Sequence, residues 1–327
     1  MAGRTPFLAI LLALAAPSVG RAQPFQVDFL YKLSSTTGVL PFQGLAVSYD
    51  PYHRETLVVG EGRVRVFNET GMEIYTFGDD PEIGGVSAAA ATDGGDFILV
   101  AYAQGAPGLI RANFRGEFKN RIELSGLPSE LPSPFLYNAI GYAKGNVYLC
   151  DLGAMRLVVV DLDGKFVAYH DLWKLVDVEE DGPGRRLDKP GEKKADARSD
   201  YGIKGFRVAP NGDVLFTVQT LFHAYVLSPD GTIRSFGTKG SAPGKFNVIT
   251  GIASDEQGYY YVADILKSAV IVFDKNFRWV KEFGYRGRAP RNLVSPIDVA
   301  AGDGKVYVSQ FARKGVSVFA VKPGETP

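Results

Sequence analysis

The stretch that decides the fold is Gly244–Gly284, which reads GKFNVITGIASDEQGYYYVADILKSAVIVFDKNFRWVKEFG. Turn-rich pieces containing Gly, Asp and Asn divide it into short runs of apolar and β-branched residues. These runs are Gly251–Ser254, Tyr259–Ala263, Ala269–Phe273 and Trp279–Phe283. Short runs of β-formers bounded by such turn residues are typical of an antiparallel meander. The stretch therefore predicts one sheet of antiparallel strands.

Degraded copies of this unit recur along the chain. Aligned on a Gly-hydrophobic-Ala start and on the apolar strand that follows it, the copies begin at or near Gly44, Ala88, Asn138, Gly205, Gly251 and Asp298. Successive starts are 44 to 50 residues apart, except for one interval of 67 residues between the third and fourth copies. A period in this range, built from four strands, indicates a β-propeller blade. We therefore predict an all-β, six-bladed β-propeller of four-stranded antiparallel blades.

The two ends of the chain are expected to share the last blade. The sixth copy stops after its third strand, at Val321, and Val27–Leu33 (VDFLYKL) resembles the outermost strand of the other copies. Pairing Val27–Leu33 with Gly315–Val321 would close the ring and remove unpaired strand edges. We therefore expect this N-terminal strand to complete the last blade.

The fifth copy is similar to the repeats of the NHL family, whose blades carry G-I-A-V-D, then G-N-I-Y-V-A-D, then a valine-rich strand ending in F-D, and then F-G. The matching residues are Gly251, Ile252, Ala253, Gly258, Tyr261, Val262, Ala263, Asp264, Val272, Phe273, Asp274, Phe283 and Gly284. The third copy keeps Tyr148, Asp151, Val160, Asp161 and Gly164, whereas Ala101 and Val218 replace the Asp of the pattern in the second and fourth copies. The resemblance implies the fold and leaves function open, because propellers carry many unrelated activities. We expect Asp151 and Asp264 to be structural acceptors for backbone donors in the loop after the second strand.

The first 22 residues have the character of a secretory signal peptide. Arg4 gives a basic start, Phe7–Ala16 forms a short apolar core, and Val19–Ala22 offers small residues before a cleavage site. The apolar core is too short to span a bilayer. We therefore expect a signal peptide over 1–22, one propeller domain over 23–327, and a secreted or periplasmic protein.

Composition narrows the class of partner. The one cysteine, Cys150, lies in an apolar strand and is expected to be a buried thiol. An exported chain that cannot form an internal disulfide favours a bacterial envelope or extracellular protein, so the NHL resemblance is to the exported bacterial type.

Lys plus Arg and Asp plus Glu both total 36, and this neutral balance argues against a nucleic acid partner. We also expect no membrane span and a monomer.

The long interval between the third and fourth copies contains a charged, turn-rich insert, Asp171–Asp200. It begins with the largely apolar Leu172–Val176 and later carries Arg185, Arg186, Lys193 and Lys194. Connections between blades emerge on the same face as the loops between second and third strands, and that face is the mouth of the propeller. A solvated loop and a partner-contacting arm anchored by Trp173 and Leu175 both fit this composition.

The mouth also collects the candidate binding residues. Asn138, Lys204 and Asp298 lie at the starts of inner strands, Gln219 follows a second strand, and Tyr137 and Trp173 flank strand ends and loops of the same face. Aromatic rings mixed with amide and ammonium groups suit a protein, peptide or glycan partner. We therefore predict a binding site made of Asn138, Lys204, Asp298, Gln219, Trp173 and Tyr137.

Catalysis would require a converging set of side chains, and the sequence offers none. The histidines His53, His170 and His223 fall in different blades, and no nucleophile elbow or Cys/His pair stands out. Our leading hypothesis is therefore an exported, non-catalytic binding or scaffold module without a cofactor.

The alternative is a metal-dependent lactonase, hydrolase or lyase of the six-bladed type. Gluconolactonase-type propellers bind a divalent metal through Glu, Asn and Asp at the starts of inner strands. The corresponding positions here carry Gln43, Asn138, Lys204, Thr250 and Asp298. Asn138 and Asp298 are suitable ligands for a hard cation such as Ca²⁺, whereas a lysine in the same ring opposes its binding.

Overall fold

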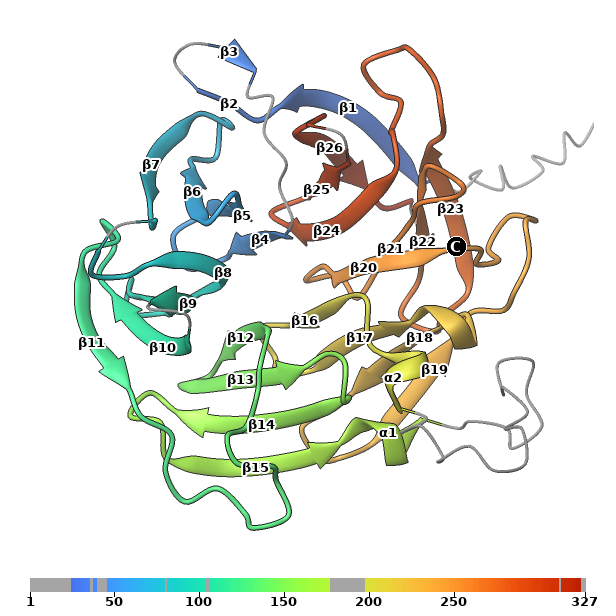
Figure 1. Cartoon of the computed structure of the whole chain (residues 1–327). Helices are drawn as coiled ribbons and strands as arrows, with labels where there is room; N and C mark the ends of the chain where they lie inside the picture. Colours follow the sequence, from blue (N-terminus) through green and yellow to red (C-terminus); the bar gives the residue numbers. More distant parts are fainter. Residues whose placement is uncertain are drawn as a thin grey trace, which may run out of the picture.

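The structure is a computed structural model that describes residues 25–35, 38–39, 46–79, 81–103, 106–176, 198–311 and 313–324. Within these residues, six sheets of four antiparallel strands stand around a central axis, as Figure 1 shows. The predicted all-β, six-bladed propeller is therefore confirmed. The expected signal peptide over 1–22 lies outside the described residues, as do Gln43 and most of the insert, 177–197.

Five blades are built from consecutive strands, with the first strand innermost and the fourth outermost (Figure 1). Blade 1 contains β4 (Ala46–Asp50), β5 (Glu55–Gly60), β6 (Arg63–Phe67) and β7 (Glu73–Phe77). Blade 2 contains β8 (Gly85–Ala91), β9 (Phe97–Ala103), β10 (Ala106–Ala112) and β11 (Phe118–Ile122). Blade 3 contains β12 (Ala139–Ala143), β13 (Asn146–Asp151), β14 (Arg156–Asp161) and β15 (Phe166–Asp171). Blade 4 contains β16 (Phe206–Val208), β17 (Val214–Val218), β18 (His223–Leu227) and β19 (Ile233–Phe236). Blade 5 contains β20 (Ile249–Ser254), β21 (Tyr260–Asp264), β22 (Ala269–Phe273) and β23 (Trp279–Gly284).

Blade 6 joins the two ends of the chain. It contains β24 (Pro296–Gly302), β25 (Lys305–Gln310), β26 (Val316–Lys322) and, as its outermost strand, β1 (Gln26–Lys32). β1 pairs antiparallel with β26, so that Val27 lies opposite Val321 and Phe29 opposite Phe319. The predicted closure of the ring is therefore confirmed. A small hairpin of β2 (Ser34–Ser35) and β3 (Gly38–Val39) follows β1.

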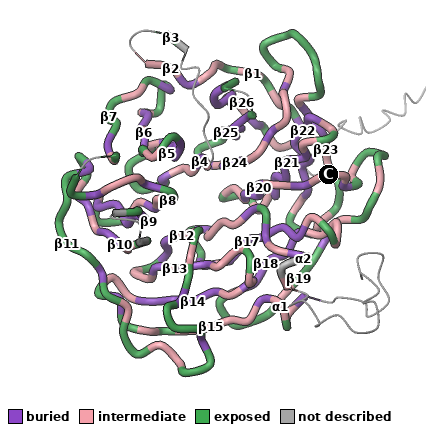
Figure 2. The backbone as a smooth tube through the Cα atoms, viewed as in Figure 1, coloured by how far each residue is buried: buried purple, intermediate pink, exposed green. Residues whose placement is uncertain are grey.

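The hydrophobic core follows the middle strands of the blades (Figure 2). β17, β21 and β22 are buried at every position, whereas β7 and β11 are largely exposed. Because both faces of a middle strand carry apolar residues, each blade packs against both neighbours. One cluster, for example, joins Leu109 of blade 2 to Leu149 of blade 3.

In the described ranges, no helix has the length and apolar character needed to cross a bilayer.

The glycine that opens several copies has a steric cause. A Cβ atom on Gly205 of blade 4 would overlap the carbonyl oxygen of Thr250 in blade 5. A Cβ atom on Gly251 of blade 5 would lie 2.6 Å from the Cα atom of Asp298 in blade 6. The inner strands converge toward the axis, so their backbones approach too closely for a side chain at these points. The repeated glycine is therefore a requirement of blade-to-blade packing.

The Asp of the repeat has the predicted structural role. One oxygen of Asp264 accepts hydrogen bonds from the backbone N–H groups of Asn247 and Val248, at 2.7 and 3.2 Å. The other oxygen accepts from the N–H of Lys267 at 3.0 Å. This buried carboxylate thus fastens the loop after β21 and the connection that enters blade 5. Asp151 fastens its own loop in blade 3 in the same manner.

Candidate functional site

A pocket of about 810 Å³ opens on the face where the inner strands begin, and we call it the mouth pocket. It is lined by Asn138, Leu152, Gly153, Asp200, Tyr201, Gly202, Ile203, Lys204, Gln219, Thr220, Phe222, Asn247 and Val248. Asn138 and Lys204 lie just before the inner strands of blades 3 and 4, and Gln219 begins the short 3-10 helix η1 (Gln219–Leu221). Three of the six predicted binding residues therefore meet in one pocket.

The charged and amide groups of the mouth pocket retain capacity to bind a ligand. Within the described residues, neither the exposed Lys204 ammonium nor the Gln219 side-chain amide makes a hydrogen bond or an ion pair. The Oδ1 atom of Asn138 accepts a hydrogen bond from the N–H of Leu152 at 3.0 Å, which leaves the Asn138 amide nitrogen as a donor. Asp200 supplies the carboxylate among the lining residues.

Buried hydrogen bonds fix the backbone that carries Lys204. The N–H of Lys204 donates to the Thr217 carbonyl at 3.0 Å, and the N–H of Gly205 donates to the Thr217 hydroxyl at 2.8 Å. That hydroxyl donates in turn to the Thr250 carbonyl of blade 5 at 2.6 Å. Thr217 is fully buried, so this part of the pocket is held between two blades and is formed before any ligand arrives.

Aromatic side chains shape one wall and its support. Phe222 ends η1 in the left-handed conformation, with φ of 55°, and lines the pocket. The Lys239 ammonium lies 5.0 Å from the centre of the Phe222 ring, a cation–π distance. Trp173 packs behind Tyr201, with ring centroids 4.9 Å apart. Trp173 therefore supports the pocket wall through Tyr201 and is not itself one of the lining residues.

The insert leaves and rejoins the propeller beside this pocket. Its first part, α1 (Leu172–Leu175), follows β15 directly, and its last part, α2 (Arg198–Tyr201), leads into the pocket wall. An ion pair between Asp171 and Arg198 joins the two ends. The basic residues that the sequence singled out in the insert, Arg185, Arg186, Lys193 and Lys194, lie outside the described residues.

Asp298 does not lie with the other candidates. A bulge in β24 separates Pro296 from Asp298, and the Asp298 side chain is buried beside blades 1 and 4. Its Oδ2 atom accepts hydrogen bonds from the Val47 N–H at 2.9 Å and from the Arg207 guanidinium at 3.0 Å. Burial raises the pKa of the Asp298 carboxyl, and the Arg207 charge acts in the opposite direction. The structure thus places Asp298 in an internal ion pair and not among the lining residues of the mouth pocket.

Arg207, which the sequence did not single out, crosses the central axis. The Nη2 atom of this blade 4 residue also donates to the carbonyls of Val47 in blade 1 and Val299 in blade 6, at 2.7 and 3.2 Å. Its Nε atom is the one buried side-chain polar atom without a partner in the part of the chain that the structure describes. A strand residue of this kind gives no sequence signal, because its role depends on partners in distant blades.

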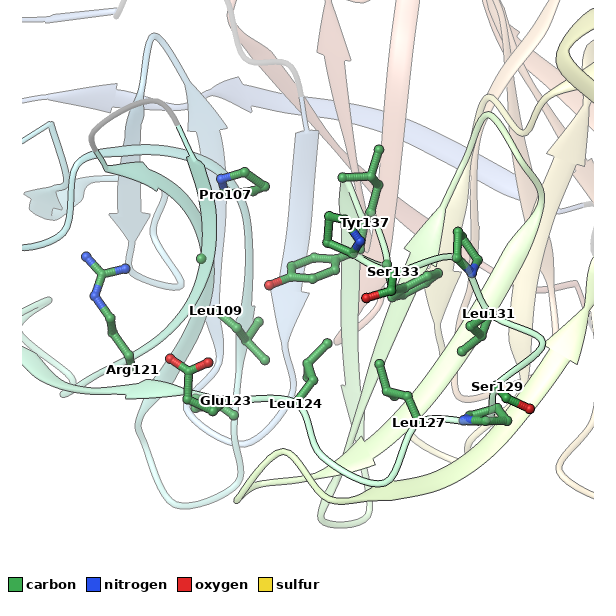
Figure 3. A pocket seen from close by; sticks show the side chains of 17 residues that line it. Pro107, Leu109, Arg121, Glu123, Leu124, Leu127, Ser129, Leu131, Ser133 and Tyr137 are labelled. Atoms are coloured by element: carbon green, nitrogen blue, oxygen red, sulfur yellow. The ribbon is translucent and has the colours of Figure 1, made fainter.

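Tyr137 precedes Asn138 in sequence but lies in a different cavity. Successive residues of an extended chain point to opposite sides, so the two side chains separate. Tyr137 lines a groove of about 640 Å³ between β10, β11 and the segment 123–137, shown in Figure 3. We call this cavity the blade 2 groove.

The two predicted metal ligands are engaged separately, Asn138 with the Leu152 N–H and Asp298 with Arg207. Across the described ranges, no group of three or more His, Cys, Asp or Glu side chains is arranged to hold a metal ion. The histidines are dispersed: His53 Nδ1 lies 2.7 Å from Asp50 in blade 1, His170 lies in β15 and His223 in β18. Within the described residues, the structure therefore does not bring Asn138 and Asp298 together at one point.

Comparison with solved structures shows the same fold at low sequence identity. A protein of unknown function from Bacteroides thetaiotaomicron is 15% identical with a TM-score of 0.60, and the match covers 91% of this chain and 76% of that one. Virginiamycin B lyase from Staphylococcus aureus is 11% identical with a TM-score of 0.51, covering 93% and 90%. A chain of a nidogen/laminin complex is 14% identical with a TM-score of 0.53, covering 81% and 88%. No family model and no curated protein matches the sequence. At these identities the likeness concerns the fold alone.

Proposed function

We propose that this chain is an exported propeller of the NHL type that binds a carboxylate-bearing partner in the mouth pocket and performs no chemistry of its own. One observation carries the proposal: Lys204, Gln219 and Asn138 meet in one pocket with donor groups that make no hydrogen bond within the described residues. The partner is a protein segment, a peptide or a glycan in the cell envelope or outside the cell.

The donors of the pocket, Lys204, Gln219 and Asn138, favour an acidic group, and Asp200 is the one lining carboxylate that opposes it. An ammonium group can only donate, and side-chain amide nitrogens donate as well, so a carboxylate with two acceptor oxygens complements them. Lys204 is exposed, and its attraction for an anion is therefore screened by salt. A few such contacts in a partly open pocket correspond to a dissociation constant on the order of 10–100 µM.

The rigid setting of these groups supports binding. Thr217 and Thr250 fix the Lys204 backbone between blades 4 and 5, and η1 fixes Gln219. A pocket formed in advance loses little conformational entropy when it is occupied. A chain of similar fold comes from a nidogen/laminin complex, which is a precedent for this architecture in a protein assembly.

The mouth pocket can be tested by calorimetric titration against two panels, one of acidic peptides and one of uronate-containing oligosaccharides. We expect binding by one panel, at least tenfold weaker binding by Lys204→Met, and weaker binding as salt rises. Lys275→Met is the matched control, because it removes an exposed lysine in the β22–β23 turn, away from the pocket. Equal affinity of Lys204→Met and Lys275→Met for every ligand would contradict the proposal.

The absence of chemistry can be tested separately. Turnover of a lactone panel with Ca²⁺ or Zn²⁺, abolished by Asn138→Ala, would overturn the non-catalytic part of the proposal and favour the metal-dependent alternative. Asn138 is the suitable position because its side chain lines the pocket, whereas Asp298 is committed to Arg207.

Export has its own test. Expression of the full chain in a bacterial host, followed by mass determination of the envelope fraction, should give a product that begins after Ala22. An uncleaved product confined to the cytoplasm would contradict this part of the proposal.

A further inference from the structure

The connection between blades 5 and 6 carries an exposed and strongly basic loop. We call 285–291 (YRGRAPR) the arginine loop, and all of its residues are exposed. Among the described residues, the side chains of Arg286, Arg288 and Arg291 have no hydrogen-bond or ion-pair partner. The loop therefore presents three positive charges to solvent.

Hydrogen bonds close the base of the arginine loop. The Oδ1 atom of Asn292 accepts from the Ala289 N–H at 2.9 Å, and its amide nitrogen donates to the carbonyls of Gly284 and Tyr285 at 3.0 and 3.1 Å. The N–H of the buried Leu293 also donates to the Tyr285 carbonyl, at 3.2 Å. The base of the loop is thus fixed, and its arginines stand on a surface that is formed before any partner arrives.

Comparison within the chain shows that the fold does not require all of this charge. The connection into blade 5, 237–246 (GTKGSAPGKF), shares with the connection into blade 6 the pattern G-x-(K/R)-G-x-A-P. Arg288 and Arg291 stand at the positions where it has Ser241 and Gly244. Because the same kind of connection can be built without these two arginines, their charge is a property of this surface and not of the fold.

Large apolar residues are exposed beside the arginine loop. Leu266, Tyr285 and Phe311 are 69%, 51% and 52% exposed. Leu266 lies between β21 and β22, Tyr285 begins the arginine loop, and Phe311 lies between β25 and β26. In an antiparallel blade, the loop between the second and third strands and the connection after the fourth strand emerge at the same end, which here is the mouth face. All three residues therefore lie on that face.

Backbone contacts join these segments. Ala269, just after the loop that contains Leu266, pairs with Gly284, just before the arginine loop. The Phe311 N–H donates at 3.1 Å to the carbonyl of Ser295, which belongs to the same connection as the arginine loop. Leu266 and Phe311 therefore flank the arginine loop, and we call these two residues together with the loop the basic rim.

The two faces of blades 5 and 6 differ in charge. Three segments of the mouth face contain six basic residues and no acidic one, and they are 265–268, 285–295 and 311–315. Three turns of the opposite face contain four acidic residues and two basic ones, and they are 255–259, 274–278 and 303–304. On the mouth face, Lys267 is paired with Glu282, and Arg313 with Glu61. The three arginines of the loop and Lys314 have no ion-pair partner among the described residues, so the basic rim attracts negative charge.

We propose that the basic rim docks the propeller on a membrane surface that contains anionic phospholipids. The arginines would contact lipid phosphates, while Leu266 and Phe311 would enter the boundary between headgroups and acyl chains. Tyrosine is a residue type that settles at this level of a bilayer, which suits Tyr285. A soluble polyanion would pair with the arginines but would leave Leu266 in water, so the exposed leucine beside the arginines favours lipid. This docking is peripheral, and it does not depend on what the mouth pocket binds.

The test is sedimentation with vesicles of two compositions, phosphatidylcholine alone and phosphatidylcholine with about 30% phosphatidylglycerol. Every strand of the propeller lies after residue 25, so the test uses residues 23–327, without the apolar stretch Phe7–Ala16. We expect half of the protein to bind at about 0.1–1 mM of the anionic lipid mixture, and binding to weaken as salt rises. Phosphatidylcholine alone should bind at least tenfold more weakly. Equal binding to both compositions, or to neither, would overturn the proposal.

The charge of the basic rim is tested by one variant that combines Arg286→Gln, Arg288→Gln and Arg291→Gln. It should bind the anionic vesicles at least tenfold more weakly, because each cation near such a surface raises the affinity about fivefold. All three side chains are exposed and have no partner among the described residues, so the variant should keep the fold, which thermal unfolding checks.

A matched control removes the same charge from the opposite face. It combines Arg115→Gln, Lys144→Gln and Lys275→Gln, three exposed residues in turns of that face. Its binding should stay within about threefold of the unchanged chain, because these charges lie beyond the reach of a screened membrane surface. Equal losses in the two triple variants would show attraction by net charge alone and would contradict docking through the basic rim.

The apolar part is tested by Leu266→Ser combined with Phe311→Ser, which keeps every charge. Binding should fall at least about fivefold, because two side chains no longer gain from leaving water. Val167→Ser is the control, since Val167 is 50% exposed in β15, the outermost strand of blade 3, and it should bind as the unchanged chain does. Unchanged binding by the Leu266 and Phe311 variant would identify the basic rim as a surface for soluble polyanions and would overturn the membrane proposal.

Discussion

Arg198 holds the carboxylate of Asp171 with both terminal nitrogens of its guanidinium, each 2.9 Å from a carboxylate oxygen. The two side chains are only 17% and 13% exposed, so the pair is partly shielded from solvent. It closes the insert at its base and sets α2, whose Tyr201 lines the mouth pocket. The planar fork of arginine matches a carboxylate in a way that lysine cannot.

Arg198→Lys should therefore weaken the base of the insert. We expect a loss of about 1–2 kcal/mol of stability, because a shielded, two-point charge-assisted contact becomes a single one. Denaturant unfolding measures this loss. The matched control is Lys174→Met, since Lys174 approaches the same Asp171 at 3.8 Å with a side chain that is 75% exposed. An exposed pair of this kind contributes at most about 1 kcal/mol, so a larger effect for Lys174 than for Arg198 would contradict the assignment.

The pair of Arg207 and Asp298 should be energetically coupled across the axis. Removal of one partner, by Asp298→Asn or Arg207→Met, should cost about 3 kcal/mol, because the other is left uncompensated in a largely buried position. The double variant should lose less than the sum of the two. A double-mutant cycle in urea measures the coupling. Strictly additive losses of stability would show that the contact contributes no interaction free energy between the blades.

Gly205→Ala should destabilise the contact between blades 4 and 5. The added Cβ atom would meet the Thr250 carbonyl and lie 2.9 Å from the Gly251 Cα atom, and backbone cannot move aside as a flexible side chain can. We expect a loss of about 2–3 kcal/mol. Gly85→Ala is the control in another inner strand, where a Cβ atom has open space, and it should change stability by less than about 1 kcal/mol. Equal thermal stability of the two variants would argue against the steric account.

Lowering the pH should reduce the stability of the fold, because it protonates the Asp96 carboxylate of blade 2. Burial acts to raise the pKa of this carboxyl, but Lys119 and Arg111 hold the pKa below its usual range. The ionised form therefore stabilises the fold above about pH 4, where the unfolded carboxyl is also ionised, and this stabilisation is lost as the pH falls through the folded pKa.

Asp96→Asn should accordingly cost about 1–2 kcal/mol at pH 7, and the difference from the unchanged chain should shrink as the pH falls below 4. Chemical unfolding at several pH values measures this. The matched control is Asp28→Asn, which removes an exposed carboxylate without an ion-pair partner among the described residues and should change stability at pH 7 by less than about 0.5 kcal/mol. If the stability lost in Asp96→Asn did not change with pH, the electrostatic explanation would be contradicted.

The fold could be predicted because its physical causes repeat. The glycine at the inner contact and the carboxylate that fastens a loop recur in the sequence, as Gly205, Gly251, Asp151 and Asp264 illustrate. The closure by β1 could be predicted by counting strands. Asn138 and Lys204 could be predicted to lie at the mouth, because all inner strands begin on that face.

The rest of the site depends on contacts that spacing does not reveal. Asp298 begins a copy, but its partner Arg207 lies 91 residues away, so sequence alone placed it at the mouth. Its position before the inner strand predicts Tyr137 on the same face as Asn138, although alternation along an extended chain sends the Tyr137 side chain into the blade 2 groove. An irregular segment forms the edge of that groove, and such segments have no repeat period from which the groove could be predicted.

The pairing of β1 with β26 has a consequence for the order in which the molecule can be assembled. During synthesis β1 appears first, and its partner appears only when almost the whole described chain has been made. β1 therefore cannot close the ring before β26 is available, and we expect the pairing of these two strands, a contact of very high sequence separation, to be the slow step of folding. A circular permutant that links Lys322 to Gln26 through a short turn and opens before β4 would make β1 and β26 neighbours along the chain. It should refold faster than the natural order at similar stability, and equal refolding rates would show that the meeting of the ends does not limit folding.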